Sequence, residues 1–217
     1  MVKKQILVLG LKTFGMSIVK QLSKYNCEVL AIDKEMDKVE TAAEYATHAI
    51  QLDIRDADEL SELALESFDI AIITVDDIEA SIMASLIFKE HGIGTVIVKA
   101  KNNVHKRILE KMEVDKIISP EEEMGIKLAK SIMNASVIDA INFSDEYSIL
   151  EINALSKWIG KTLISLNLRV EYGMNVLCIK NPNKELDISP SLDYVIENGD
   201  ILVAIVENKK IENTELT

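Results

Sequence analysis

Residues 5–15 read Gln-Ile-Leu-Val-Leu-Gly-Leu-Lys-Thr-Phe-Gly, and residues 28–33 read Glu-Val-Leu-Ala-Ile-Asp. The first stretch is a short apolar run that ends at Gly10 and passes into a helical pattern. The second is an apolar run that ends in Asp33. Strand, tight turn, helix, strand and acid in this order are typical of a dinucleotide-binding βαβ unit, with phosphates at the helix N-terminus and ribose at the carboxylate. We therefore predict a Rossmann-type fold for the start of the chain.

The glycine fingerprint of this unit is incomplete. The pattern Gly-x-Gly-x-x-Gly has its outer glycines at Gly10 and Gly15, but Lys12 replaces the middle one. Its Cβ projects into the approach of a pyrophosphate, although its ammonium offers a compensating positive charge. Asp33 follows Gly15 by 18 residues, near the usual spacing of about 20. Two interpretations stay open: a nucleotide site of weakened affinity, or a unit that folds this way and binds nothing there.

Strand-like and helix-like segments alternate up to about residue 135, which predicts a doubly wound parallel sheet with right-handed crossovers. Ser119, Pro120 and the glutamates 121–123 are typical of a helix N-terminus. The expected strands are Gln5–Leu9, Glu28–Ile32, His48–Leu52, Asp69–Val75, Thr95–Ala100 and Lys116–Ile118. The expected helices are Phe14–Lys24, Asp37–Glu44, Ala57–Glu66, Ile78–His91 and Val104–Met112.

A change of pattern near residue 136 indicates a second unit. Residues 125–134 have the spacing of an amphipathic helix, and β-like runs follow at Tyr147–Ile152, Asn175–Ile179 and Ile201–Val206. We therefore expect a Rossmann-type domain over residues 1–135 and a small α+β domain over residues 136–217. The second domain has only about 80 residues, so we expect it to dimerise.

The composition is that of a globular protein, with 48% hydrophobic and 28% charged residues among 217. The formal net charge is −12 and the basic residues are not clustered, so we expect no nucleic-acid partner. Cys27 and Cys178 are expected to be reduced, buried packing residues. No apolar run has the length of a signal-peptide core or a membrane span, which predicts a cytosolic protein.

Few residues offer catalytic chemistry. His48, His91 and His105 lack a partnering acid at motif spacing, so we expect surface or edge residues rather than catalysts. Asp76 and Asp77 follow the fourth strand, at the edge where ligands of this fold lie. They either reach a metal or ribose hydroxyls, or cap the helix that follows. The chain favours a binding module, and the alternative is a small NAD(P)-dependent oxidoreductase.

Further segments are distinctive as sequence. Tyr-Ala-Thr-His-Ala stands at 45–49, Val-Lys-Ala-Lys-Asn at 98–102, and Asp-Lys-Ile-Ile-Ser-Pro-Glu at 115–121. Leu-Arg-Val-Glu-Tyr-Gly stands at 168–173, Val-Leu-Cys-Ile-Lys at 176–180, and Asn-Gly-Asp-Ile-Leu at 198–202. With the opening βαβ unit, these segments make nearly the whole chain resemble the RCK (regulator of K+ conductance) family. These are cytosolic regulatory subunits of Ktr and Trk potassium-uptake systems, and the chain is most similar to the KtrA/KtrC type.

The resemblance implies a potassium-uptake regulator rather than an enzyme. Its N-terminal domain would bind ATP or ADP, or NAD or NADH, and its C-terminal RCK domain would bind cyclic di-AMP at a dimer interface. Copies of the chain would assemble from dimers into rings of up to eight. The ring would lie at the inner face of the cell membrane, beneath an ion-translocating subunit of the KtrB, KtrD or TrkH type.

Carried over by position, the resemblance also implies a set of binding residues. Gly10 and Gly15 would hold the phosphate turn, Asp33 the ribose and Asp53 the adenine. The full N-terminal set is Gly10, Lys12, Thr13, Phe14, Gly15, Asp33, Lys34, Asp53, Asp76, Asp77 and Lys99. Beyond it, Glu121 matches a family glutamate near the phosphates and an associated cation, and Arg169 and Pro190 match the C-terminal dinucleotide site.

The chain departs from the family loop, which usually reads Gly-Leu-Gly-Arg-Phe-Gly. Lys12 stands in place of a glycine and Thr13 in place of an arginine that resembles a γ-phosphate sensor. Val75 stands where relatives usually carry glycine, which crowds the pocket further. Without the arginine the affinity difference that drives a gating shift is reduced. We therefore expect weakened nucleotide binding, and regulation that depends on the C-terminal ligand or on an altered nucleotide preference. Two alternatives stay open: Lys12 replaces the arginine functionally, or the nucleotide site is silent.

Overall fold

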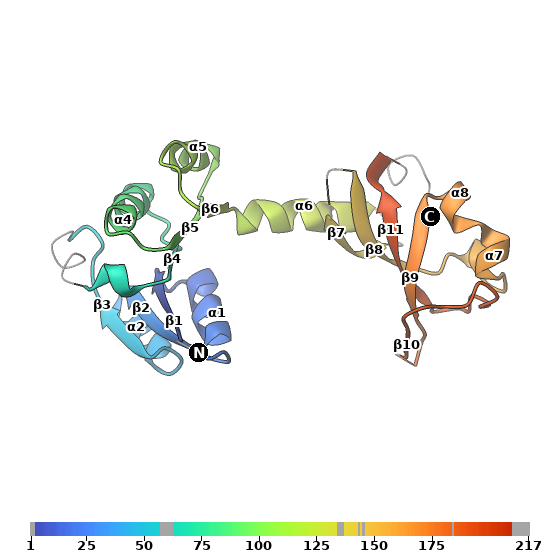
Figure 1. Cartoon of the computed structure of the whole chain (residues 1–217), viewed down its shortest axis with the longest axis horizontal. Coiled ribbons are helices and arrows are strands. Elements are labelled where there is room, and N and C mark those ends of the chain that lie inside the picture. Colours follow the sequence, from blue (N-terminus) through green and yellow to red (C-terminus); the bar gives the residue numbers. More distant parts are fainter. Residues whose placement is uncertain are drawn as a thin grey trace. The chain divides into compact units, whose positions relative to one another are not determined.

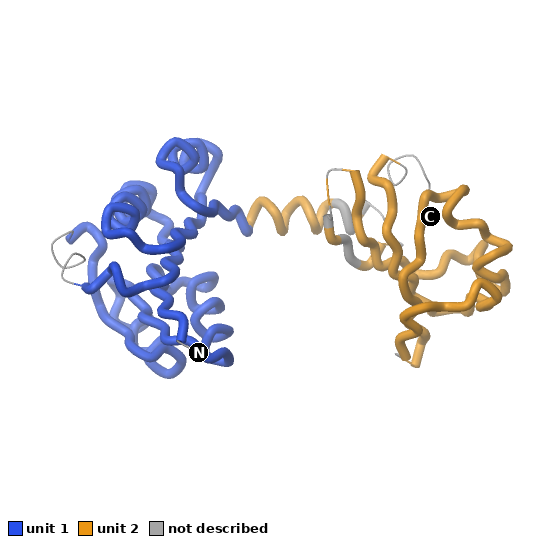
Figure 2. Tube along the Cα trace, viewed as in Figure 1, with its two compact units in different colours: residues 1–120 blue, residues 121–217 orange. Residues whose placement is uncertain are grey.

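The computed structural model describes residues 3–56, 63–133, 137–142, 144, 146–183 and 185–209. The chain forms two compact units, residues 1–120 and 121–217 (Figure 2). The expected boundary between residues 135 and 136 differs from this division in the assignment of α6 (Pro120–Met133). The domain boundary between residues 135 and 136 stays a prediction.

The first unit contains a six-stranded parallel sheet in the order β3-β2-β1-β4-β5-β6 (Figure 1). Its strands are β1 (Lys4–Leu9), β2 (Cys27–Asp33), β3 (His48–Gln51), β4 (Ile70–Ile73), β5 (Thr95–Lys99) and β6 (Lys116–Ile118). Its helices are α1 (Thr13–Leu22), α2 (Met36–Ala43), α4 (Ile78–Glu90) and α5 (Asn103–Lys111), with the 3-10 turn η1 (Leu65–Ser67). The predicted doubly wound fold is confirmed, with the ends of matching elements within two residues of expectation.

Helices cover both faces of this sheet, which explains why its strands are apolar throughout. Successive side chains of β1 point to opposite faces. Leu7 and Leu9 belong to one buried cluster, with Phe88 of α4 and Leu109 of α5. Ile6 and Val8 belong to another, with Val19 of α1 and Val39 of α2. Strands buried on both sides therefore read as continuous Ile, Leu and Val runs.

Two local predictions need correction, and a third concerns residues that lie largely outside the described part of the chain. His105 is completely buried, because its position on α5 shares the face of Leu109 that packs on the sheet. Cys27 and Cys178 are free thiols, but half-buried rather than buried. The predicted helix Ala57–Glu66 lies largely outside the described residues, and its described end is the short turn η1.

The second unit contains a five-stranded antiparallel sheet in the order β10-β9-β11-β8-β7. Its strands are β7 (Val137–Asn142), β8 (Tyr147–Asn153), β9 (Met174–Lys180), β10 (Leu186–Asp187) and β11 (Ile201–Glu207). Three short helical turns, η2 (Ser156–Trp158), α7 (Leu163–Leu166) and α8 (Leu168–Glu171), join β8 to β9. The sequence predicted β8, β9 and β11, but not β7, β10 or the turns. Helix α6 begins at Pro120, which confirms the helix N-terminus predicted at residues 119–123, and it continues through the predicted amphipathic stretch 125–134 to Met133.

The core of the second unit gathers around Trp158, which is 1% exposed. The Tyr172 ring meets it edge to face, with ring centroids 5.3 Å apart. Such an arrangement places the positive edge of one ring on the negative face of the other.

Among the described residues of the whole chain, no helix combines the length and the apolar character that crossing a bilayer requires.

Candidate functional site: the crevice between β1 and β4

The candidate site lies where the strand order of the parallel sheet reverses. Strands β1 and β4 are neighbours, and their chains leave the sheet into α1 and α4, which cover opposite faces. In open parallel sheets, ligands bind at this reversal, beyond the carboxyl ends of the strands. A cavity lies there, formed by the ends of β1, β2, β3 and β4. The predicted residues that line it are Gly10, Lys12, Asp33, Lys34, Asp53, Asp76 and Asp77.

The two remaining glycines of the fingerprint are required by the tight turn between β1 and α1. Gly10 has φ +92°, and a Cβ there would lie 2.9 Å from the backbone nitrogen of Val75. A Cβ on Gly15 would lie only 1.9 Å from the carbonyl oxygen of Gly10 and 2.6 Å from Oγ1 of Thr74. The Thr74 hydroxyl donates to that same carbonyl at 2.7 Å. The turn is therefore clamped against β4, as the predicted roles of both glycines require.

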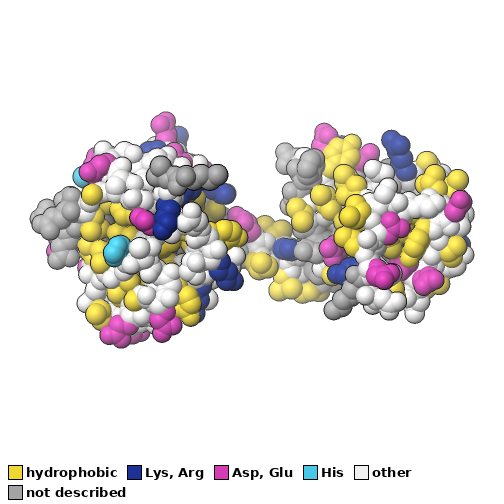
Figure 3. Space-filling model, turned by 60° about the horizontal axis from the view of Figure 1, so that its bottom comes forward, with side chains coloured by type: hydrophobic (Ala, Val, Ile, Leu, Met, Phe, Trp, Pro, Cys, Tyr) yellow, Lys and Arg dark blue, Asp and Glu magenta, His cyan; other side chains and the backbone are white. Residues whose placement is uncertain are grey.

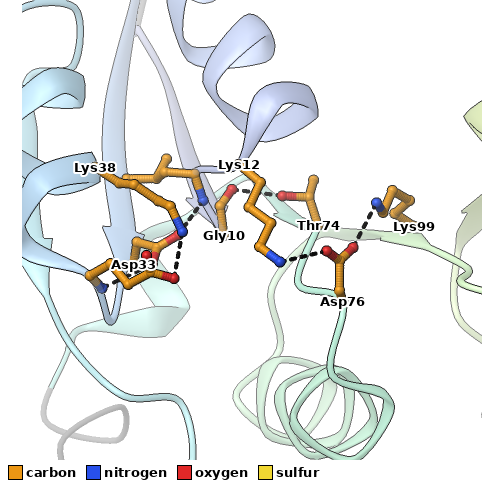
Figure 4. A network of polar contacts seen from close by, with 9 residues as sticks. Gly10, Lys12, Asp33, Lys38, Thr74, Asp76 and Lys99 are labelled. Carbon is orange, nitrogen blue, oxygen red and sulfur yellow. Dashed lines mark hydrogen bonds and ion pairs between the residues drawn. The ribbon is translucent and has the colours of Figure 1, made fainter.

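Lys12 occupies its position without backbone strain. It is the N-cap residue of α1, with extended φ −67° and ψ −176° that need no glycine. No side chain caps this helix and its first turn contains no acid. The N–H groups of that turn and the positive end of the helix dipole therefore offer an anion-binding surface. The Lys12 side chain extends across the crevice to Asp76 (Figure 4).

Asp76 holds two lysines, one with each carboxylate oxygen. Oδ2 accepts from Lys12 Nζ at 2.8 Å, and Oδ1 accepts from Lys99 Nζ at 2.9 Å (Figure 4). The hydrogen bonds from Lys12 and then Lys99 lower the pKa of Asp76 to about 2. The carboxylate is therefore ionised at any physiological pH. Of the two roles open for the acid pair, capping is confirmed for Asp77, which accepts from Ala80 N at 3.0 Å.

Asp33 ends β2 and is held rigidly at the floor of the crevice. Its Oδ2 accepts from the backbone N–H of Leu11 at 2.6 Å, and its Oδ1 accepts from that of Glu35 at 3.0 Å. The side chain is 8% exposed and lines the cavity. A carboxylate oxygen accepts more than one hydrogen bond, so Asp33 can still receive a ribose hydroxyl. The contact with Leu11 also ties β2 to the glycine turn.

Charged residues that the sequence did not single out complete the rim. The Arg55 guanidinium pairs with Asp77, and Lys38 Nζ pairs with Glu35 Oε1 at 2.6 Å. The hydrogen bond to Glu35 raises the pKa of Lys38 above its usual value. Both cations line the cavity and could meet phosphate or ribose oxygens. The sequence signal for Arg55 was its position two residues after Asp53, past the end of β3.

The structure does not bring every predicted residue into this cavity. Thr13 and Phe14 form the first turn of α1, and Lys99 joins the site through Asp76. Glu121 lies in the first turn of α6, and within the described part of the chain no group of three or more potential metal ligands is assembled. In the second unit, Arg169 lies on α8 and is exposed, and Pro190 lies in the segment between β10 and β11. The ligand roles of all these residues stay predictions.

These features define a class: a Rossmann-type crevice domain followed by a small antiparallel-sheet domain. The TrkA-N domain model matches residues 6–120, and the TrkA-C domain model matches residues 147–215. The chain therefore belongs to the TrkA-N/TrkA-C family.

Two relatives from Bacillus subtilis match almost end to end. Ktr system potassium uptake protein C is 41% identical over 204 residues, which cover 94% of this chain and 92% of the relative. Ktr system potassium uptake protein A is 39% identical over 213 residues, which cover 98% and 96%. Among solved structures, the GsuK channel has a TM-score of 0.68 at 15% identity, covering 97% of this chain and 38% of the channel chain. That likeness supports the fold.

Proposed function

We propose that this protein is the cytosolic regulatory subunit of a Ktr-type potassium uptake system and acts at the inner face of the membrane. The observation that carries the proposal is the identity of 39–41% with two Ktr system potassium uptake proteins, which spans both units of the chain. This relationship favours the regulatory role over the oxidoreductase alternative, because these relatives are potassium uptake proteins. The membrane partner would be an ion-translocating subunit of the KtrB, KtrD or TrkH type.

In this function, the crevice between β1 and β4 binds an adenine nucleotide, ATP or ADP, or NAD or NADH. The phosphates would lie on the uncapped first turn of α1, near Gly10, Gly15 and Lys12. Asp33 would receive a ribose hydroxyl, and Asp53, which follows β3 and lines the same cavity, would contact the adenine. The acid-free helix end and the buried, oriented carboxylate support this pose.

Calorimetric titration of the full chain with ATP, ADP and NADH tests the crevice. We expect measurable binding of at least one of them, and a Kd about tenfold or more higher for that ligand in Asp33→Asn, because a hydrogen bond to a charged acceptor is lost. Glu40→Gln, on the exposed side of α2, is the matched control for loss of one negative charge. If Asp33→Asn loses its fold, Asp53→Asn provides the second test. Equal affinity in the wild type and both pocket variants would contradict the assignment.

We propose that the second unit binds cyclic di-AMP near Arg169 and Pro190. The support is the family membership of this unit and the exposed guanidinium of Arg169, which suits a phosphate. Titration of the full chain with cyclic di-AMP should give a Kd at least about tenfold higher in Arg169→Gln than in the control Lys161→Gln. No heat and no thermal shift with the wild type would contradict this part of the proposal.

We also propose that the chain assembles into a larger oligomer and that it binds a cation. The second unit leaves many hydrophobic side chains exposed, which supports assembly of dimers into a larger ring (Figure 3). Four of these side chains lie on α6, where Met124, Ile126, Leu128 and Ile132 are 51–72% exposed. Glu121, in the first turn of α6, is the proposed ligand of a monovalent or divalent cation.

A further inference from the structure

The pair formed by Lys12 and Asp76 spans the mouth of the crevice. Lys12 belongs to the loop between β1 and α1, and Asp76 to the loop between β4 and α4. These loops lie at the carboxyl ends of the two neighbouring strands whose chains diverge to opposite faces. The ammonium of Lys12 is therefore held by a carboxylate at the place where a nucleotide phosphate would approach the first turn of α1.

The two lysines hold Asp76 unequally. The Lys12 and Asp76 side chains are 59% and 38% exposed, whereas the Lys99 side chain is only 10% exposed. Exposed ion pairs contribute little to stability, because water screens them and long side chains lose freedom. A nucleotide di- or triphosphate carries several negative charges where Asp76 carries one, so at equal distance it attracts the Lys12 ammonium more strongly. The contact with Lys12 is thus the one that a phosphate can replace, while Lys99 keeps Asp76 in place.

We propose that Lys12 and Asp76 form an ion pair that nucleotide phosphates displace, so that Lys12 reads the negative charge of the ligand. In the structure Asp76 neutralises Lys12. When a nucleotide binds, its phosphates replace Asp76 as the partner of the Lys12 ammonium. The remaining Asp76 carboxylate faces the ligand and opposes binding. This proposal rests on the proposed nucleotide function of the crevice. It gives the lysine in the middle of the glycine fingerprint a role in ligand selection, next to Thr13, which contributes no charge.

Two opposing effects then set affinity. Lys12 attracts the phosphates, and Asp76 both competes for Lys12 and repels the ligand. Removing the Asp76 charge should therefore strengthen binding, which is the reverse of what a purely structural ion pair predicts. Because Coulomb energies add over the ligand charges, the gain should grow from AMP to ADP to ATP. Removing the Lys12 charge should weaken binding, and more so once Asp76 no longer competes.

The test is calorimetric titration of the full chain with AMP, ADP and ATP in magnesium-free buffer at low ionic strength. We expect Asp76→Asn to lower the Kd for ATP about two- to fivefold, the range for release of an exposed pair. The change should be smaller for AMP. Lys12→Gln should raise the Kd for ATP, by a larger factor in the Asp76→Asn background than alone. Such non-additivity is the sign of direct coupling between two residues.

Matched controls separate this effect from net charge and from misfolding. Glu40→Gln removes one negative charge from α2, and Lys106→Gln removes one positive charge from α5, both at exposed positions outside the cavity. Circular dichroism and thermal melting verify the fold of every variant. If any variant unfolds, Asp76→Ser and Lys12→Met test the same charges with other side chains.

The outcomes are distinct. An unchanged or higher Kd for ATP in Asp76→Asn, with binding retained by the wild type, overturns the displaceable pair and leaves the nucleotide site standing. Equal gains in affinity for AMP and ATP in Asp76→Asn also overturn the proposal, because a response to ligand charge requires a gain that grows with the number of phosphates. A flat titration with the wild type and all variants contradicts nucleotide binding itself, and this proposal with it.

Discussion

The glycine turn shows how single atoms decide the shape of the site. Gly15, in the first turn of α1, lies so close to the carbonyl of Gly10 that a methyl group has no room, and Thr74 lies against the same position. Lys12, in contrast, has an ordinary extended backbone, so its side chain costs no conformational strain. The substituted fingerprint therefore keeps its fold, and what changes is the charge that it presents.

Gly15→Ala should be clearly destabilising, whereas a matched glycine substitution should not. The new Cβ would lie 1.9 Å from the Gly10 carbonyl oxygen, so the turn must shift, at a cost of about 1–3 kcal/mol or more in unfolding free energy. Gly125, inside α6, has no atom within 4 Å of its ideal Cβ. Gly125→Ala should therefore be neutral or stabilising by about 0.5–1 kcal/mol. Urea unfolding followed by circular dichroism measures both, and equal effects would refute the role given to the turn.

At the scale of elements, the polar cluster before β11 holds the end of the second sheet. Asp200 is fully buried, and its Oδ2 accepts from the Tyr194 hydroxyl at 3.0 Å and from Glu197 N at 2.8 Å. Its backbone carbonyl accepts from Ala154 N at 2.8 Å, which connects the cluster to the end of β8. Burial, followed by the hydrogen bond to Asp200, raises the pKa of the Tyr194 phenol to about 12.

Tyr194→Phe should lower the unfolding free energy by about 1–3 kcal/mol near neutral pH, because a charged buried acceptor loses a donor. The folded protein retains the phenol proton more strongly than the unfolded chain, so this contribution is complete below about pH 10. It should disappear as the pH rises from about 10 to 12. Denaturant unfolding from pH 8 upward measures the difference between wild type and variant. Tyr25→Phe, at a residue 63% exposed, is the control, and a difference that does not shrink with pH would count against the cluster.

The sequence predicted elements well where burial imposes a clear pattern. The strands of the parallel sheet are apolar along their whole length because both faces are covered, and they were found. The helical turns α7 and α8 have only four residues each, too short for any periodic signal. His105 was misplaced because the helix residues 103–111 are mostly polar, and only the sheet beneath decides which face is buried.

The candidate site was predicted in position but not in its contacts. The glycines, Asp33 and the acid pair were found, since strand ends of a parallel sheet converge at one edge. The network of Lys12, Asp76 and Lys99 joins residues 64 and 23 positions apart, and no local pattern links them. Arg55 and Lys38 were missed for the same reason, because long flexible side chains take partners that only the folded chain brings near.

At the scale of the whole molecule, the proposed assembly can be tested at α6, which exposes several apolar side chains. Substituting Leu128, which is 59% exposed, by Asp should weaken self-association, because a charge in an apolar contact must be desolvated. Sedimentation velocity should show a shift from a multi-subunit particle toward smaller species. The control Glu122→Gln, in the first turn of the same helix, should leave the distribution unchanged. A wild-type protein that is monomeric at high concentration would contradict the proposed assembly.

The proposed regulation of potassium uptake by this chain in response to a nucleotide can be tested as a whole. The most direct measurement is potassium flux into vesicles that contain a Ktr-type membrane subunit, with and without the purified chain. We expect the flux to depend on the chain, to differ between ATP and ADP, and to lose that nucleotide dependence in Asp33→Asn. Flux that is the same with and without the chain, under every nucleotide, would contradict the proposed regulatory function.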